Sequence, residues 1–203
     1  QFSDEMGVTM ILVPAGEFGM GSEADTAVAE CKELCSTCSC TRSSFVNAEP
    51  FHQVYLDDYY LDRTEVTNAL YAACVQAGAC TPPAENSSSS RSSYYGNADY
   101  ADYPVIHVDW NQARAYCEWR GADLPTEAQW EKAARGADGR IYPWGDTFDG
   151  SKTNFCDSNC AYDWAFSEWD DGYGDTAPVG SYPEGASPYG ILDMAGNVWE
   201  WVQ

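Results

Sequence analysis

Positive charge is scarce in this sequence. Its 203 residues include 10 Lys and Arg against 32 Asp and Glu, which gives a net charge of −22. Such a chain repels phosphate groups, which excludes generic nucleic-acid binding and disfavours anionic membrane surfaces. No apolar run approaches the ~20 residues that span a bilayer, so we expect no membrane span. The carboxylates are either a solvated surface that keeps the protein soluble or, in part, ligands for cations such as calcium.

Histidines and known catalytic patterns are also scarce. The two histidines, His52 and His107, each lie in an apparent strand, where a structural role is the simpler interpretation. The sequence contains no His-Glu-x-x-His, no Gly-x-Ser-x-Gly, no phosphate-binding glycine loop and no dinucleotide-binding pattern. Paired carboxylates such as Asp170 and Asp171 can do acid–base work, but calcium binding suits their Gly-rich acidic loop better.

Cysteines, in contrast, are frequent, with nine in the chain. Their spacing suggests two short disulfide loops, Cys74 to Cys80 and Cys156 to Cys160. Two more disulfides can form within a cluster made of Cys31, Cys35, Cys38 and Cys40. Zinc is the competing interpretation of that cluster, but its uneven spacing and the lack of a nearby His favour disulfides.

This cysteine density indicates an oxidising compartment, and we expect an extracellular or cell-surface protein. Asn86 begins an Asn-Ser-Ser acceptor sequence for glycosylation, which is consistent with export. The chain begins at Gln1 without a basic start and an apolar run, so we expect that a signal peptide has already been removed.

Hydrophobic periodicity predicts a mixed α+β chain with long loops. Residues 10–13 and 17–20 read as a strand pair around a Pro-Ala-Gly turn, and residues 52–56 as a half-buried strand. Three helices are expected to begin after the capping residues Thr67, Asp109 and Thr126, the last two with capping boxes. The polar stretches 22–50 and 81–103 are expected as inserted loops, and residues 138–190 lack regular patterns. We therefore expect one domain over residues 1–203.

Several motifs follow one another in a specific order. They are Phe18-Gly19-Met20-Gly21-Ser22; Glu65-Val66-Thr67-Asn68 with Tyr71; Pro104 to Trp110; Leu124-Pro125-Thr126-Glu127-Ala128-Gln129-Trp130-Glu131; Pro143-Trp144-Gly145; Pro178-Val179-Gly180-Ser181; and Tyr189-Gly190 through Trp201. In this order and spacing the chain resembles the formylglycine-generating-enzyme, or sulfatase-modifying-factor, family. The resemblance covers the chain outside the two inserted loops. It implies a compact, loop-rich α+β fold related to C-type lectins, with little regular secondary structure, stabilised by calcium and disulfides.

Residue chemistry and the family resemblance both predict bound calcium. Oxygen-bearing side chains in the irregular C-terminal half are natural ligands for calcium, which takes six to eight oxygens. These side chains are Asn154, Asp171, Asp193 and Glu200. The resemblance implies two structural sites. The first would use Asn154, the Phe155 carbonyl, Asp171 and the Tyr173 carbonyl. The second would use Asp193, the Gly196 and Val198 carbonyls, and Glu200.

The resemblance also bears on catalysis. In catalytic members a cysteine pair downstream of the Asn-Val-Trp-Glu-Trp motif binds copper and activates oxygen to oxidise a substrate cysteine. This sequence ends at Gln203, before that pair and before the family's C-terminal segment. Cys117 matches a position that in some members pairs with a cysteine near the C-terminal end; the alternative is a buried free thiol.

We therefore expect an extracellular calcium-binding module that is non-catalytic as it stands. It would bind a protein or glycan ligand or build a surface assembly, as a homo-assembly or through C-terminal complementation in trans by strand addition. The alternative is a copper-dependent formylglycine-generating oxidase, which converts a protein cysteine to formylglycine and whose catalytic cysteines lie beyond residue 203.

Overall fold

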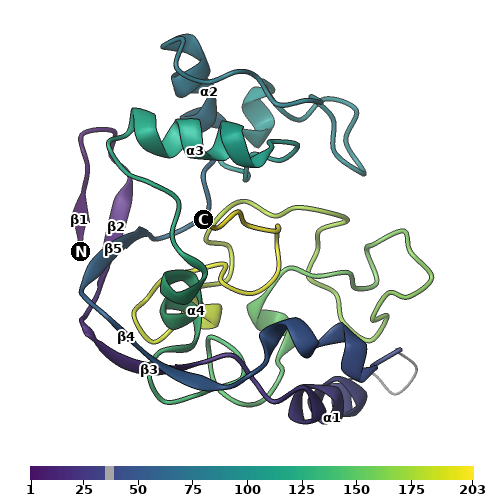
Figure 1. The fold of residues 1–203 in the computed structure, drawn as a ribbon. Helices are drawn as coiled ribbons and strands as arrows, with labels where there is room; N and C mark the ends of the chain where they lie inside the picture. The colour runs from purple at the N-terminus through teal and green to yellow at the C-terminus, as the bar shows by residue number, and fades with distance from the viewer. Residues whose placement is uncertain (35–38) are drawn as a thin grey trace.

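The structure is a computed structural model that describes residues 1–34 and 39–203. Two small antiparallel sheets lie along one side of the molecule (Figure 1). The first has the order β1-β2-β5 and consists of β1 (Phe2–Ser3), β2 (Thr9–Val13) and β5 (Tyr59–Asp62). The second pairs β3 (Gly16–Met20) with β4 (His52–Leu56). The expected loop-rich α+β fold is confirmed.

The expected pairing of residues 10–13 with residues 17–20 is wrong. β2 pairs with β5, with Val13 opposite Tyr59, whereas β3 pairs with β4, with Gly16 opposite Leu56. Both pairings keep the same register, so residues 10–20 and 52–62 form one long ribbon with a bend in it. The chain bends at Pro14 without reversing because Pro has no N–H to continue the ladder.

Three helices form where the sequence predicts them. They are α2 (Asn68–Gln76), α3 (Trp110–Trp119) and α4 (Glu127–Arg135). The side chain of Thr67 caps α2, and complete capping boxes join Asp109 to Gln112 and Thr126 to Gln129. Two capping residues and their N3 partners were enough to locate α3 and α4, because these side chains satisfy the free N–H groups of the first turn.

The stretch 22–50 is not the simple loop expected from its polarity. Residues Ala24–Leu34 form α1, whose three alanines favour a helix. Short 3-10 turns are the remaining regular structure: η1 (Arg42–Ser44), η2 (Val46–Ala48), η3 (Ala98–Tyr100), η4 (Gly150–Lys152) and η5 (Pro183–Gly185). Only η4 and η5 follow α4, so the C-terminal third is nearly all loop, as expected. No described helix is long and apolar enough to cross a membrane.

His107 does not lie in a strand, contrary to expectation. It is exposed and lies in an irregular segment with a φ of 59°, in the left-handed region. The apolar residues around it suggested a strand, but this backbone angle cannot continue one. His52 lies in β4 as expected, also exposed.

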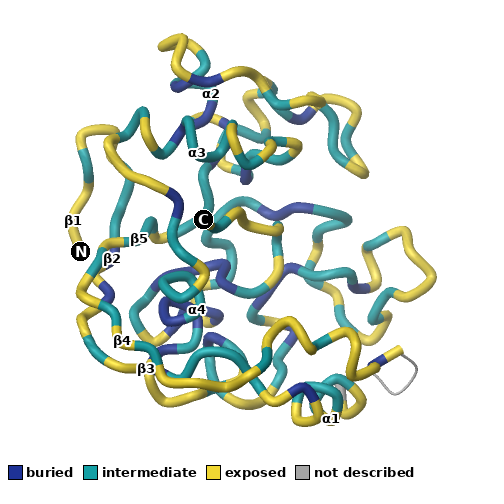
Figure 2. The backbone as a smooth tube through the Cα atoms, viewed as in Figure 1, coloured by how far each residue is buried: buried dark blue, intermediate teal, exposed yellow. Residues whose placement is uncertain are grey.

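Two apolar clusters form the core. The larger one joins β2 and α4 to the loop around residues 191–194 and contains Ile11, Val13, Ala133, Ala134, Ile191 and Met194. The smaller one lies between α2 and α3 and contains Tyr71, Cys74, Cys80 and Tyr116. Figure 2 shows buried residues on α4 and in the loops beside it, while the outer loops are exposed. The irregular C-terminal loops are therefore part of the core.

Three disulfides hold the described loops. Cys74–Cys80 and Cys156–Cys160 are the short loops expected from the spacing. Cys31–Cys40 joins α1 to the segment that follows it. The other two members of the four-cysteine cluster, Cys35 and Cys38, lie outside the described residues. Cys117 is free.

Candidate metal sites

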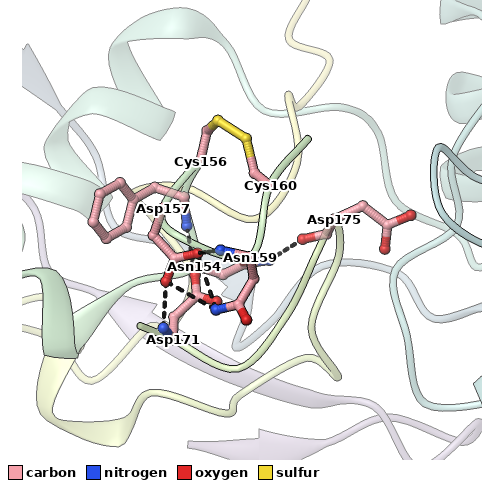
Figure 3. Close-up of a disulfide and its surroundings, with 8 residues drawn as sticks. Asn154, Cys156, Asp157, Asn159, Cys160, Asp171 and Asp175 are labelled. Carbon is pink, nitrogen blue, oxygen red and sulfur yellow. Dashed lines mark hydrogen bonds between the residues drawn. A yellow bond between two sulfur atoms is a disulfide. The ribbon is translucent and has the colours of Figure 1, made fainter. Parts of the chain in front are cut away.

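The first candidate site lies beside the Cys156–Cys160 disulfide (Figure 3). The Asp171 carboxylate accepts hydrogen bonds from the backbone N–H groups of Phe155 at 3.1 Å and Tyr173 at 2.8 Å. The structure thus brings Asp171 to the two residues whose carbonyls the sequence assigned to the same site. Burial, together with the neighbouring Asp157 carboxylate, raises the pKa of Asp171.

Asp157 is a member of this cluster that the sequence analysis missed. Its side chain is fully buried and accepts hydrogen bonds from the backbone N–H groups of Asn159 and Asp171. Two carboxylates, Asp157 and Asp171, therefore lie together (Figure 3). The signal in the sequence was weak, because Asp157 is one of many acidic residues in this segment.

Asn154, the remaining predicted ligand, is buried and positioned by its amide group. Its Nδ2 donates to the Asp175 carbonyl at 2.7 Å and to the Asn197 Oδ1 at 2.9 Å. Both donor hydrogens of this amide are used, and none of the described residues donates to its oxygen, which can accept from a ligand.

The second candidate site is centred on Asp193, which is buried in a left-handed turn with a φ of 58°. One of its oxygens accepts the Gly180 N–H at 2.6 Å. Glu65 lies against it: the Glu65 Oε1 accepts from Asn197 at 3.0 Å, but its buried Oε2 has no hydrogen-bond partner among the described residues. Burial, the Asp193 charge and the Glu200 charge raise the pKa of Glu65, and burial raises the pKa of Asp193.

Glu200, the other predicted side-chain ligand of this site, contacts Trp130 of α4. Its Oε2 accepts a hydrogen bond from the Trp130 Nε1 at 3.2 Å. Although surrounding atoms raise the pKa of Glu200 to about 7, the residue as a whole is exposed, so water offsets part of that effect. The carbonyls of Gly196 and Val198 accept no hydrogen bond from a described residue and are free to bind a cation. The structure thus brings Asp193 and Glu65 together, and the charges of Asp193 and Glu200 act on Glu65.

A cation is chemically suited to both sites. Residues 153–203 contain nine Asp and Glu and no Lys, Arg or His, so no protein cation can neutralise these carboxylates from within the segment. The orphaned Oε2 of Glu65 is a buried acceptor that needs a proton or a cation. Among the described residues, however, no three His, Cys, Asp or Glu side chains gather closely enough to hold a metal ion on their own. Amide and backbone carbonyl oxygens would therefore supply most ligands, a donor set that suits calcium.

Asn197 connects the two sites and was not singled out from the sequence. Its Oδ1 accepts from Asn154 and from the Ala177 N–H at 2.9 Å, and its Nδ2 donates to Glu65. Its φ of 56° is one that Asn tolerates better than most residues. Glu65 and Asn197 both belong to the motifs that carry the resemblance, which was the signal available for them.

Comparisons with known proteins agree with this fold. A family model described as "Sulfatase-modifying factor enzyme 1-like domain" matches residues 2–203. The chain is 44% identical to the inactive C-alpha-formylglycine-generating enzyme 2 of Bos taurus over 110 residues, which cover 52% of this chain and 34% of that protein. It is 32% identical to the formylglycine-generating enzyme of Streptomyces coelicolor over 228 residues, which cover 94% of this chain and 67% of that protein.

Among solved structures, PvdO from Pseudomonas aeruginosa superposes with a TM-score of 0.70 at 24% identity. The match covers all of this chain and 73% of PvdO, and at this identity it supports the fold alone. The chain spans about a third of the length of the inactive mammalian relative and about two thirds of that of the bacterial enzyme.

Proposed function

Because the chain belongs to the sulfatase-modifying factor enzyme 1-like family, we propose that it is a non-catalytic, calcium-binding extracellular module that binds a protein or glycan ligand or builds a surface assembly. The single observation that carries the calcium proposal is the pair made by Glu65 and the buried Asp193, in which the buried Oε2 of Glu65 has no partner among the described residues and residues 153–203 contain no cationic side chain. Calcium would be held at the second site by Asp193, the Gly196 and Val198 carbonyls, and Glu200. At the first it would be held by Asn154, Asp171 and the Phe155 and Tyr173 carbonyls.

Bound calcium would act structurally. It would neutralise carboxylates that burial otherwise makes costly, and it would fix loops that have few helical or strand hydrogen bonds. Residues of this chain would position the ligands. Asn197 hydrogen-bonds to Asn154 at the first site and to Glu65 at the second, and the Cys156–Cys160 disulfide closes the loop beside the first site.

Two observations support a non-catalytic role. The 44% identity is to a relative whose name calls it inactive. Cys117, the free cysteine among the described residues, has a thiol whose pKa burial raises to about 11. Such a thiol is almost wholly protonated at neutral pH, and the protonated form is neither a nucleophile nor a metal ligand.

An extracellular location is supported by the three disulfides, which persist in oxidising compartments. Asn86 is exposed in its loop, which leaves its side chain open to glycosylation.

The calcium proposal is tested by thermal unfolding of the purified chain with calcium and with excess chelator. A ligand that binds only the native state stabilises by mass action, so we expect chelation to lower Tm by several degrees, roughly the effect of 1–3 kcal/mol. Readdition of calcium, but not of potassium, should restore it. Identical unfolding curves with and without chelator would refute the proposal, and D193N is expected to weaken the calcium response.

A formylglycine-generating oxidase remains the second candidate, because the match to the bacterial enzyme extends over 94% of this chain. Copper would then be the cofactor, bound by cysteines outside these 203 residues. The test is to incubate the gene's full product and copper with a cysteine-containing peptide under oxygen. Mass spectrometry would detect conversion of the cysteine to formylglycine, and conversion that depends on copper would favour this candidate over the first.

A further inference from the structure

The loop that follows the Cys156–Cys160 disulfide presents two exposed aromatic side chains at its tip. Tyr162 is 57% exposed and Trp164 is 60% exposed. Their rings nevertheless stack on each other, with centroids 5.1 Å apart and an angle of 10° between the ring planes. Because each ring gives one face to the other, the stack leaves its outer faces to solvent. We refer to Tyr162 and Trp164 as the tip pair.

The base of this loop is anchored to the rest of the fold. The Phe166 N–H donates to the Cys156 carbonyl at 3.0 Å, and the Ser158 N–H donates to the Trp169 carbonyl at 3.2 Å. The aromatic side chains near the base pack against one another and are partly buried: Phe148, Phe155, Phe166 and Trp169. The tip pair is therefore the aromatic part of this loop that the fold leaves exposed, on the side of the molecule opposite β1 (Figure 1).

A preformed pair of exposed rings is suited to binding. Single exposed apolar residues are ordinary on protein surfaces, but two stacked rings offer a flat, contiguous apolar surface. Tyr and Trp are also enriched among the residues that contribute most to protein–protein binding. Because each ring already holds the other in place, little side-chain freedom is left to lose when a partner binds.

The charge around the tip pair selects the kind of ligand. Residues 153–175 contain six Asp and Glu and no Lys, Arg or His. Asp163 lies between the two aromatic residues in the sequence, Glu168 and Asp170 follow them, and all three are exposed. The face of an aromatic ring attracts cations as well, through its quadrupole. Rings and carboxylates therefore both favour a cationic ligand, and the net charge of −22 disfavours a second copy of this chain.

We propose that the tip pair binds an arginine side chain on the surface of a basic partner protein. The planar guanidinium stacks on an outer face of the pair, and the exposed carboxylates of the same loop attract its charge. Arginine suits this surface better than lysine, because a guanidinium stacks on aromatic faces and is more weakly hydrated than an ammonium. This inference names the partner chemistry of the proposed binding module, and so it rests on that proposed function.

The test is an NMR titration of the calcium-loaded product of the whole gene, followed through the amide signals of residues 156–170. The probe is a Gly-Ser peptide of about nine residues, roughly 30 Å when extended, with arginines at alternate positions. We expect it to bind about tenfold more tightly than the same peptide with citrulline, which keeps the planar group but not the charge. A lysine version should have an intermediate affinity, and added salt should weaken binding.

Variants then locate the binding site. W164A removes the larger ring and should weaken binding of the arginine peptide about fivefold or more. The matched control is Y55A, which removes a 62% exposed ring from β4 and should leave the affinity unchanged. D163N removes one carboxylate of the tip and should weaken binding about twofold, whereas D58N, close to Tyr55 in the sequence, should not. All four side chains are exposed, so the variants should fold like wild type.

Several results would overturn the proposal. They are equal binding of the arginine and citrulline peptides, wild-type affinity in W164A, and a tip pair that binds phosphatidylcholine vesicles or a neutral oligosaccharide instead of the arginine peptide. If the arginine peptide does not bind while chelation still lowers Tm, this inference fails and the calcium proposal stands.

Discussion

Asn154 donates its side-chain amide to the side-chain oxygen of Asn197 at 2.9 Å, and Asn197 in turn donates to Glu65 at 3.0 Å. This chain of amides links the loop around Asp171 to the loop around Asp193. The Asn197 N–H also donates to the Asn154 carbonyl at 2.9 Å, so hydrogen bonds from both the main chain and the side chains hold these two loops together. The two candidate calcium sites are therefore mechanically coupled, and ordering one should favour ordering the other.

The first prediction concerns Asn197. N197A removes the hydrogen bonds to Asn154, Ala177 and Glu65 and places Ala at a φ of 56°, so we expect a loss of roughly 2–4 kcal/mol of unfolding free energy. N197G removes the same bonds without the backbone strain and should lose about 1 kcal/mol less. Urea unfolding in calcium measures both. A wild-type stability for N197A would show that the amide chain does not couple the loops.

The second prediction concerns Arg91, which fastens the inserted loop 81–103 to the acidic loops. Its guanidinium pairs with Asp175, donates to the Thr176 carbonyl at 2.9 Å, and lies 4.9 Å from the ring centroids of Tyr100 and Tyr103. R91A leaves the largely buried Asp175 carboxylate without its cation and should cost roughly 2–4 kcal/mol. R91K should recover only part of this, because an ammonium cannot make the same forked contacts.

The matched control for Arg91 is Arg42, which pairs with Asp25 and Glu49 but is 56% exposed. Because exposed ion pairs contribute little, R42A should cost less than about 1 kcal/mol in the same urea titration. Equal losses for R91A and R42A would mean that the Arg91 contacts do not anchor the loop.

The third prediction concerns the reactivity of Cys117. Burial raises its thiol pKa from 9.0 to about 11, so at pH 8 the native thiolate fraction is about a hundredfold below that of the unfolded chain. Iodoacetamide should therefore label Cys117 about a hundredfold more slowly in the native protein than in urea, as read by peptide mapping. A native rate close to the unfolded rate would show that the thiol is not buried in solution.

The raised pKa of Cys117 also makes the stability of the protein depend on pH. The pKa of Cys117 is higher in the folded protein than in the unfolded chain. The thiol's contribution to the free energy of unfolding is therefore fully present below pH 9.0 and is lost as pH rises to about 11. The difference between wild type and C117A in unfolding free energy should therefore shrink across that alkaline range.

Capping chemistry made the helices predictable, because the N-terminal signals of α3 and α4 are local in sequence. The pairing of β2 and β3 was not predictable in the same way. The decisive contacts are the hydrogen bonds from the buried Lys132 Nζ to the Pro14 and Gly16 carbonyls at 2.8 and 2.9 Å, which support the bend from a helix more than 100 residues away. No local sequence pattern predicts a contact between residues so far apart in the chain.

The residues of the candidate sites also differ in whether the sequence alone could predict them. Ligands with carboxylate or amide side chains could be proposed from the sequence, since their chemistry is visible in the residue type. The roles of Asp157 and Glu65 could not, because they depend on burial and on a neighbour brought close by the fold. Glu200 stays a prediction: its Oε2 accepts the Trp130 indole N–H, and a carboxylate has further lone pairs with which it can bind a cation.

The final prediction separates backbone strain from packing at the coupled sites. Gly196 has a φ of 87°, and a Cβ there would overlap the Thr153 hydroxyl and the Asn154 carbonyl. Gly190 has nearly the same φ, 89°, with no atom within 4 Å of a Cβ. G190A should therefore show the strain alone, about 1–2 kcal/mol, whereas G196A should exceed about 3 kcal/mol because the two loops must also separate. Separating them breaks the Asn197 N–H to Asn154 carbonyl bond, so G196A should also reduce the chelator-dependent fall in Tm, and G190A should retain it. If the two variants unfold alike in urea and respond alike to chelator, the close approach at Gly196 does not hold the sites together.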